Sequence, residues 1–187
     1  MSLPKQTAAI FEKLSKGQFI CSNAGNDDER RWYNVIDEFY DDLYEYFLAI
    51  NFKLERGNEF FYFTRNEAKA DLERKIEAAY KWIDIIDFFK TFESTFGAGY
   101  RFTPSDLLVR VNVDATLKNK LESLKKYTKE DTYMNSILKI IDILRRDNFV
   151  ELENEITNMY KVLTSFAYLE ELILSINIPT EVQHEIP

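Results

Sequence analysis

Two short segments of this chain are patterned as β-hairpins, although most of the remaining sequence is patterned as helix. The first is NFKLERGNEFFYFTRNE at residues 51–67, in which Gly57-Asn58 separates two runs of strand-favouring residues. The second joins residues 149–152 to 159–163 through the polar connector ENEITN. Few folds combine helices with isolated hairpins, so we predict a mainly α fold with two short β-hairpins, of the α+β class.

Apolar residues at intervals of three and four predict the helices around these hairpins. The predicted helices lie at residues 8–16, 30–50, 68–96, 114–127, 132–146 and 165–176, with one more beginning at Thr103-Pro104. Gly17 has the position of a C-cap, and Asn26 or Asp27 that of an N-cap. Thr103 and Asp106 form a variant capping box, Thr-Pro-Ser-Asp. Helices therefore account for most of the chain.

The elements follow one another as helix, helix, hairpin, then a long helix, three helices, a second hairpin and a final helix. A hairpin that closes a small helical group is the plan of a winged helix, so we interpret the chain as tandem winged-helix domains. Residues 1–66 are predicted to form an N-terminal winged-helix domain. Residues 67–178 are predicted to form a long linking helix and a C-terminal winged-helix domain, and residues 179–187 a flexible tail.

Charge and cysteine content limit the function and the compartment. The chain has 24 basic and 32 acidic residues, a net charge of −8, which is unfavourable for gripping nucleic acid with its whole surface. Cys21 is the only cysteine, so an internal disulfide is excluded and a reducing compartment is expected. The sequence has no apolar run of signal-peptide or membrane-spanning type. We therefore expect a soluble, cytoplasmic protein without membrane contact.

Residue types that perform catalysis or hold metals are scarce. His184 is the only histidine and lies in the predicted tail, and the five glycines form no phosphate-binding loop. Metal ligation by thiolate and imidazole is excluded by count. Carboxylates are abundant, but acidic pairs on helices are usually solvated. We therefore predict a protein without enzymatic activity, and with no catalytic residues, metal or cofactor.

The helix predicted at residues 30–50 has a strongly acidic face with tyrosines beside it. Residues 27–45 contain eight acidic and only two basic residues. Tyrosines beside carboxylates are typical of interface cores, so we predict a surface for a partner or for self-association here. The residues predicted to form it are Tyr33, Tyr40, Tyr44, Asp37 and Asp41. An ordinary solvated helix face explains the same charges.

The second arm of the first hairpin is almost entirely aromatic, FFYF at residues 60–63. We expect alternate rings to fill the core of the first domain and the others to touch the long helix. Alternatively, the hairpin edge accepts an added strand from a partner peptide.

Four segments resemble, in order and spacing, the bacterial condensin subunit MukE and its shorter relatives called MksE. They are LSKGQFI at 14–20, FYDDLYEYF at 39–47, GNEFFYF at 57–63 and LRRDNFVEL at 144–152. The resemblance covers residues 14–172. In that family a dimer of tandem winged-helix proteins binds a kleisin, which bridges the heads of an SMC-type ATPase. This chain departs from the family in its connector ENEITN and in lacking a long C-terminal extension, so a regulatory contact by such an extension is not implied.

The resemblance implies a basic pair before the second hairpin that touches DNA phosphates. Residues 114–146 are the least acidic region, with eight basic and five acidic residues. The residues predicted to contact DNA are Lys139, Arg145 and Arg146. Such contacts would position the complex without reading sequence. Arginines in a last helical turn also stabilise the helix dipole, and basic residues on a solvated face need no ligand.

The resemblance implies a non-catalytic, kleisin-binding subunit of a bacterial condensin-like SMC complex that acts in chromosome organisation and segregation. It also implies a homodimer, a nucleoid-associated location and DNA contact only within the complex. Two alternatives remain open: a stand-alone winged-helix transcription regulator that binds DNA, and the equivalent subunit of a plasmid-defence SMC complex. The regulator needs a recognition helix rich in arginine, asparagine or glutamine, and residues 132–146 contain few of these.

Overall fold

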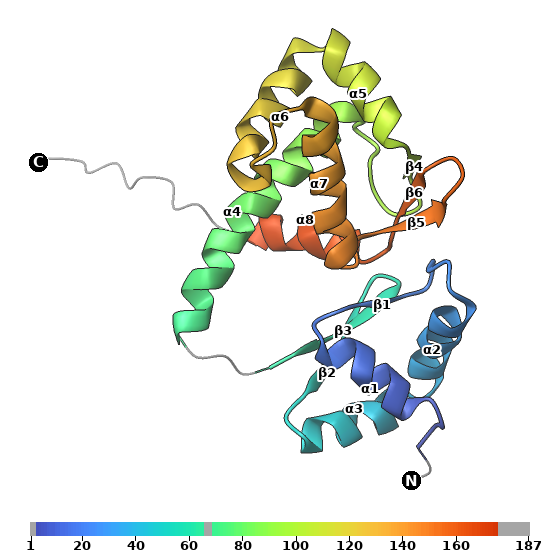
Figure 1. Cartoon of the computed structure of the whole chain (residues 1–187). Coiled ribbons are helices and arrows are strands. Elements are labelled where there is room, and N and C mark those ends of the chain that lie inside the picture. The colour runs from blue at the N-terminus through green and yellow to red at the C-terminus, as the bar shows by residue number, and fades with distance from the viewer. Residues whose placement is uncertain (1–2, 66–68, 176–187) are drawn as a thin grey trace, which may run out of the picture.

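The computed structural model describes residues 3–65 and 69–175, with the side chains of all of these except 69–78 and 175. Its elements confirm a mainly helical α+β fold with two small antiparallel sheets (Figure 1). The N-terminal elements are α1 (Thr7–Ser15), β1 (Ile20–Cys21), α2 (Asp27–Glu38), α3 (Tyr40–Ala49), β2 (Lys53–Gly57) and β3 (Phe60–Thr64). The C-terminal elements are α4 (Lys69–Phe92), β4 (Arg101–Phe102), α5 (Pro104–Val113), α6 (Ala115–Thr128), α7 (Tyr133–Arg146), β5 (Val150–Asn154), β6 (Met159–Val162) and α8 (Phe166–Ser175).

The prediction of one continuous helix at residues 30–50 is wrong. The segment is two helices, α2 and α3, that meet at Phe39, whose φ of −112° and ψ of 30° lie outside the helical range. Ile36 and Phe47 are both fully buried in the same core. A straight helix would separate them by roughly 16 Å along its axis, so the bend lets both reach one small core.

The predicted helix boundaries are otherwise close to those observed. The side chain of Asn26 accepts hydrogen bonds from the backbone N–H groups of Asp28 and Glu29, so Asn26 is the N-cap of α2. The capping box of Thr103 and Asp106 at the start of α5 is confirmed. The long helix α4 ends at Phe92, four residues before its predicted end.

The first sheet has the strand order β1-β3-β2 and the second β4-β6-β5, all antiparallel. Both hairpins are confirmed, and each gains a third strand of two residues that the sequence did not predict. Because β1 pairs with Phe60 and Phe61, it covers part of the hairpin edge that strand addition would need.

The turn of the first hairpin lies one residue later than predicted. Gly57 pairs with Phe60, so the turn consists of Asn58 and Glu59, and Glu59 has the positive φ of 64°. Gly57 is required for space, because a Cβ there would lie 2.0 Å from Cζ of Phe60. The glycine therefore admits a buried ring rather than a left-handed turn.

The buried residues form two cores on the two faces of the first sheet. The smaller core combines α1, α2 and α3 with Phe61 of β3. The larger core combines the C-terminal helices with residues of the first half, namely Phe19, Cys21, Ala24 and Phe60. Figure 1 shows the first sheet between the N-terminal helices and the C-terminal half. The two halves of the chain, residues 3–65 and 69–175, are therefore docked through a shared core, and we refer to them as the N-terminal and C-terminal units.

Candidate interaction surfaces

The bend between α2 and α3 creates an acidic depression of about 420 Å³. Its lining residues are Asp37, Glu38, Phe39, Tyr40, Asp41, Asp42 and Arg56. The guanidinium of Arg56 lies 3.2 Å from Oδ1 of Asp37 and 4.5 Å from the centre of the Tyr40 ring. One cation therefore faces four carboxylates, and the depression has a strongly negative potential.

The three tyrosines of the predicted partner surface are anchored in the N-terminal unit. Tyr33 packs on Phe61 with ring centres 5.1 Å apart, and Tyr40 stacks on Tyr44 at 6.0 Å. The hydroxyl of Tyr40 donates to the carbonyl of Leu54 at 3.0 Å. Burial, aided by neighbouring carboxylates, raises the pKa of Tyr33 and of Tyr40. Asp37 and Asp41 are exposed, so a partner arriving here would meet carboxylates first and tyrosine edges second.

The basic residues predicted to contact DNA lie on the exposed side of α7. Lys139 and Arg145 are exposed, and Arg145 is engaged with Asp142 of the same helix at 3.2 Å. Arg146 is also exposed but faces elsewhere, because it lines the space between the two units. Leu138, 43% exposed, shares a shallow hollow with Lys139 and Asp142. The three predicted residues therefore do not form one continuous basic patch.

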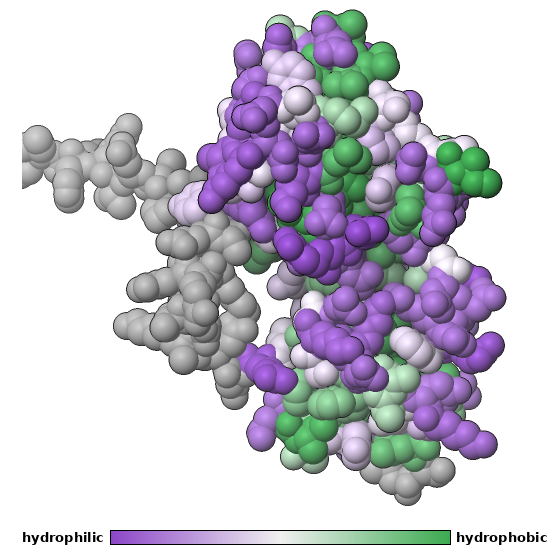
Figure 2. All heavy atoms as spheres, viewed as in Figure 1, coloured by the Kyte–Doolittle hydropathy of each residue, from purple (hydrophilic) through white to green (hydrophobic). Residues whose placement is uncertain are grey.

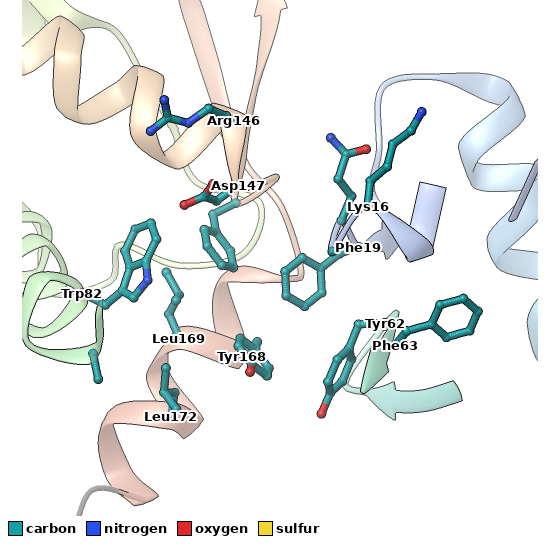
Figure 3. A pocket seen from close by; sticks show the side chains of 14 residues that line it. Lys16, Phe19, Tyr62, Phe63, Trp82, Arg146, Asp147, Tyr168, Leu169 and Leu172 are labelled. Carbon is teal, nitrogen blue, oxygen red and sulfur yellow. The ribbon is translucent and has the colours of Figure 1, made fainter. Parts of the chain in front are cut away.

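An aromatic cleft of about 620 Å³ lies between the two units, and we refer to it as the inter-unit cleft. Its lining residues come from five segments of the chain, 16–19, 62–63, 79–82, 146–149 and 168–172. Figure 3 shows rings from both units converging on it. The acidic depression, a hollow beside α1 and a hollow on α7 are each lined by one unit alone.

The walls of the inter-unit cleft are held by a chain of ring contacts. The ring centre of Phe19 lies 5.4 Å from that of Phe149 and 5.3 Å from that of Tyr168. Tyr62 meets Tyr168 edge-on at 5.1 Å, and Trp82 meets Phe149 edge-on at 5.2 Å. Such contacts each add to the stability given by burial, so the cleft is a preformed feature of the docked units.

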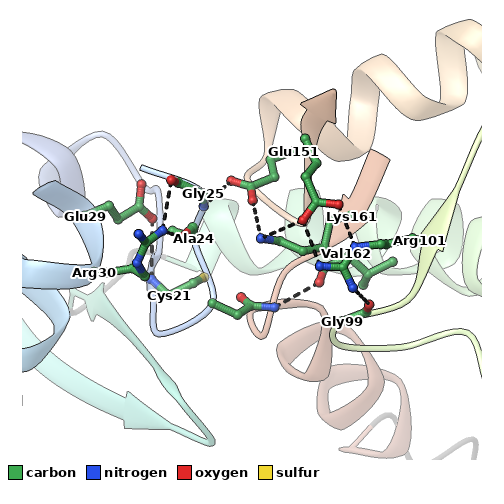
Figure 4. A network of polar contacts seen from close by, with 12 residues as sticks. Cys21, Ala24, Gly25, Glu29, Arg30, Gly99, Arg101, Glu151, Lys161 and Val162 are labelled. Carbon is green, nitrogen blue, oxygen red and sulfur yellow. Dashed lines mark hydrogen bonds and ion pairs between the residues drawn. The ribbon is translucent and has the colours of Figure 1, made fainter. Parts of the chain in front are cut away.

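A polar network also joins the two units (Figure 4). Gly25 N donates to Oε2 of Glu151 at 2.9 Å, and Lys161 Nζ lies 2.7 Å from Oε1 of the same carboxylate. Asn23 donates to the carbonyl of Val162 at 3.1 Å and accepts from the N–H of Thr164 at 3.0 Å. Lys161 is only 8% exposed, and the carboxylate of Glu151 compensates its positive charge. These bonds fix the register of the loop after β1 against β6.

The rim of the inter-unit cleft is basic, in contrast to the chain as a whole. Lys16 and Arg146 lie on the same side of it (Figure 3), and among the side chains that the structure describes Asp147 is its one acidic lining residue. Burial raises the pKa of the Asp147 carboxyl, and the positive charges of Lys81 and Arg146 oppose that rise. Burial, with Tyr168 and Glu55 nearby, raises the pKa of Tyr62 to about 12. The cleft thus combines apolar walls with cationic side chains at its mouth.

The described part of the chain has few groups with the chemistry of catalysis or metal binding. Cys21 is fully buried, and burial raises the pKa of its thiol, which disfavours the nucleophilic thiolate. Among residues 3–65 and 69–175, no group of three or more His, Cys, Asp or Glu side chains is arranged to hold a metal ion. None of the helices in that part of the chain has the length and apolar character required to cross a bilayer.

The outer surface carries apolar side chains in addition to these sites (Figure 2). Leu48 and Ile50 at the end of α3 are 48% and 41% exposed, next to Tyr46 at 41%. Ile156 at the tip of the second hairpin is 94% exposed, on a turn held by the Asn154 side chain, which accepts from the N–H of Ile156. Neither the exposure of Leu48 and Ile156 nor the inter-unit cleft was predicted, because neither periodicity nor local composition marks them.

Comparison with known protein families identifies the chain. The fold defines a mainly helical α+β protein with two small antiparallel sheets. A family model described as condensin complex protein MksE matches residues 5–173, nearly the whole chain. This protein belongs to the MksE family, and membership makes it a subunit of a condensin-like complex. A comparison with curated proteins gave no match.

Proposed function

We propose that this chain is the non-catalytic, kleisin-binding subunit of a bacterial condensin-like SMC complex that acts in chromosome organisation and segregation. The observation that carries the proposal is the family match over residues 5–173. The docked units support an architectural role, because a shared core and a polar network hold their surfaces in one arrangement. The chain would act in the cytoplasm at the nucleoid, through its kleisin, on an SMC-type ATPase.

The domain division belongs to the same proposal. We assign residues 1–66 to one winged-helix domain and residues 67–178 to a linking helix with a second. The tail predicted at residues 179–187 lies outside the described residues. The order helix, strand, helix, helix, hairpin in the first unit is consistent with this interpretation. The second unit has the same short third strand beside its hairpin, which supports a tandem arrangement.

The acidic depression is the surface we assign to contact between protein subunits, either a basic segment of the kleisin or a second copy in a homodimer. Its carboxylates attract a cationic partner and repel DNA. The exposed apolar residues Tyr46, Leu48 and Ile50 lie in the second half of α3 and at its C-cap. Tyr46 is one helical turn after Asp42 of the depression, so these residues can extend the same contact area. The participants in this surface are Tyr33, Tyr40, Tyr44, Asp37 and Asp41.

Contact with DNA, only within the assembled complex, is the prediction for Lys139, Arg145 and Arg146. Lys139 and Arg145 share the exposed side of α7 and are its main candidates, whereas Arg146 lines the inter-unit cleft. Two or three phosphate contacts give weak binding that falls steeply with salt. A stand-alone transcription regulator is not favoured, because the exposed side of α7 presents Leu138 and pairs Arg145 with Asp142. Binding of the isolated chain to duplex DNA, measured against salt concentration, separates the two: tight specific binding near physiological salt would support the regulator.

Co-purification tests the proposed function directly. The full chain is mixed with the kleisin and the SMC-type ATPase encoded in the same genome, and the mixture is analysed by size-exclusion chromatography with light scattering. We expect a stable complex of the chain with the kleisin, and a larger one when the ATPase is added. Separate elution of the chain and the kleisin at micromolar concentrations would refute the proposal.

A further inference from the structure

The inter-unit cleft has the chemistry of a binding site for a peptide segment. Its volume of about 620 Å³ is in the range of ligand sites and holds a few side chains. The walls are rings already fixed by contacts with each other, so binding here orders few protein groups. Such a preformed aromatic site selects an apolar anchor on its ligand.

The charges at the mouth select a second property of the ligand. Arg146 is exposed, and it has no ion pair with a carboxylate among the described residues. The side chain of Lys16 is 61% exposed and forms an ion pair with Glu12 on the surface of α1. Burial raises the pKa of the Asp147 carboxyl in the cleft and so disfavours its negatively charged form. A net positive rim in a chain of net charge −8 is complementary to an acidic ligand.

We infer that the inter-unit cleft binds an acidic segment of the kleisin, inserting an aliphatic or aromatic side chain between Phe19, Tyr62 and Tyr168 and setting carboxylates against Arg146 and Lys16. This inference rests on the proposed kleisin partner and adds the site and the chemistry of the bound segment. Because both units line the cleft, the segment binds only when they are docked. It would therefore also hold the units together in the complex.

Two matched pairs of substitutions test the site with the full chain and the purified kleisin. Arg146→Glu reverses a charge on the cleft, and Arg145→Glu does the same one residue away, outside it. Leu172→Trp fills the cleft from α8, and Leu174→Trp adds the same ring at a side chain that is 82% exposed on the same helix. Isothermal titration calorimetry measures kleisin affinity, and circular dichroism checks that each variant is folded.

We expect Arg146→Glu and Leu172→Trp each to weaken kleisin binding at least tenfold, and their controls to change it less than threefold. Equal losses in Arg145→Glu and Arg146→Glu, or unchanged affinity in both cleft variants, would overturn the cleft assignment while leaving kleisin binding intact. Absence of binding by the unsubstituted chain would instead refute the proposed function. The two failures are thus distinguishable.

Other occupants give different results. Deletion of residues 176–187 should leave kleisin affinity within about twofold, whereas a tenfold gain would assign the cleft to the chain's own C-terminal segment. Light scattering should give the same mass for Leu172→Trp as for the unsubstituted chain, whereas loss of a dimer would assign the cleft to a second copy. A photoreactive amino acid at position 172 should crosslink to a kleisin segment rich in Asp and Glu around an apolar residue. Crosslinking to a basic segment would contradict the charge argument.

Discussion

The acidic depression and the inter-unit cleft differ in how they are built and in what they can bind. The depression comes from one bend and one neighbouring strand, and four carboxylates face a single arginine. The cleft comes from five segments of both units, and rings of both units line it beneath two basic side chains. A surface that needs one local bend survives as long as its unit folds, whereas a surface shared by two units exists only while they are docked. Disrupting each in turn separates stability from partner binding.

Removal of the central ring of the cleft should have the largest effect on stability. Phe19 is 6% exposed and contacts rings of both units. Phe19→Ala should lower the free energy of unfolding by about 3–5 kcal/mol, as expected for truncation of a buried phenylalanine. Tyr46→Ala, at a side chain 41% exposed near the depression, should change it by about 0.5 kcal/mol or less. Urea denaturation measures both, and equal losses would contradict the distinction between the surfaces.

A substitution that crowds the buried ring of Phe60 should have the next largest effect on stability. Gly57→Ala forces a methyl group against the buried ring of Phe60, which packs on Phe19 at 5.6 Å. We expect a loss of about 1–3 kcal/mol, typical of overpacking. At Gly97 the nearest atom to an added Cβ is 3.7 Å away, so Gly97→Ala should be close to neutral. Thermal unfolding of the two variants checks this, and a neutral Gly57→Ala would show that the Phe60 ring can move freely.

Reversing charges at the acidic depression should affect association and spare stability. With Asp37→Lys and Asp41→Lys together, we expect binding to the subunit that contacts this surface to weaken about tenfold, or about 1.4 kcal/mol. Asp131→Lys with Glu155→Lys changes the net charge equally at exposed sites elsewhere and is the control. Surface plasmon resonance with the kleisin, and sedimentation for a homodimer, measure the effect. The same loss in both double variants would indicate net charge alone.

Neutralising the cleft carboxylate should give a small gain in stability. Burial raises the pKa of Asp147, so ionisation of this carboxyl costs more free energy in the folded chain than in the unfolded one. Asp147 is also the C-cap of α7, where a negative charge is unfavourable. A raised pKa means that stability is fully present below the unfolded value near 3.8 and is lost as pH rises through the folded value. Asp147→Asn should therefore raise the melting temperature by roughly 1–3 °C at pH 7. The gain should disappear below pH 3.8, and a gain of equal size at low pH would contradict the electrostatic cause.

The smallest effect expected is spectroscopic. The pKa of Tyr62 is raised to about 12, chiefly by burial in the cleft, so this phenol stays protonated where ordinary tyrosines ionise. Its contribution to stability is complete below pH 10 and is lost as pH rises from 10 through about 12. Absorbance titration of the chain and of Tyr62→Phe should differ by one group titrating near 12. A difference near pH 10 would mean that the cleft is more solvated than its rings suggest.

Much of the fold could be predicted from the sequence, because local signals determine it. Apolar spacing, Asn26, and the pair of Thr103 and Asp106 specify helices within a few residues. The bend at Phe39 could not be predicted, since it arises from the need of Ile36 and Phe47 to reach one core. The role of Gly57 was also hidden, because its cause is the ring of Phe60 rather than the turn.

The candidate sites divide in the same way. The acidic depression was anticipated through Asp37, Tyr40 and Asp41, which are close in sequence. The inter-unit cleft was not anticipated, because Phe19 and Phe149 are far apart in sequence and meet only when the units dock. The expected alternation of the aromatic arm is confirmed in part: Phe61 belongs to the smaller core and Phe60 to the larger one. Tyr62 packs on Tyr168 of α8, a contact that no local pattern in the sequence predicts.

In the proposed complex, docking of the two units creates the surface that binds the kleisin. Hydrogen–deuterium exchange of the full chain, alone and with saturating kleisin, tests it without any substitution. We expect slower exchange in residues 16–19, 146–149 and 168–172 on binding, because these segments line the cleft from both units. Unchanged exchange in all three segments within a formed complex, with protection confined to one unit, would contradict it.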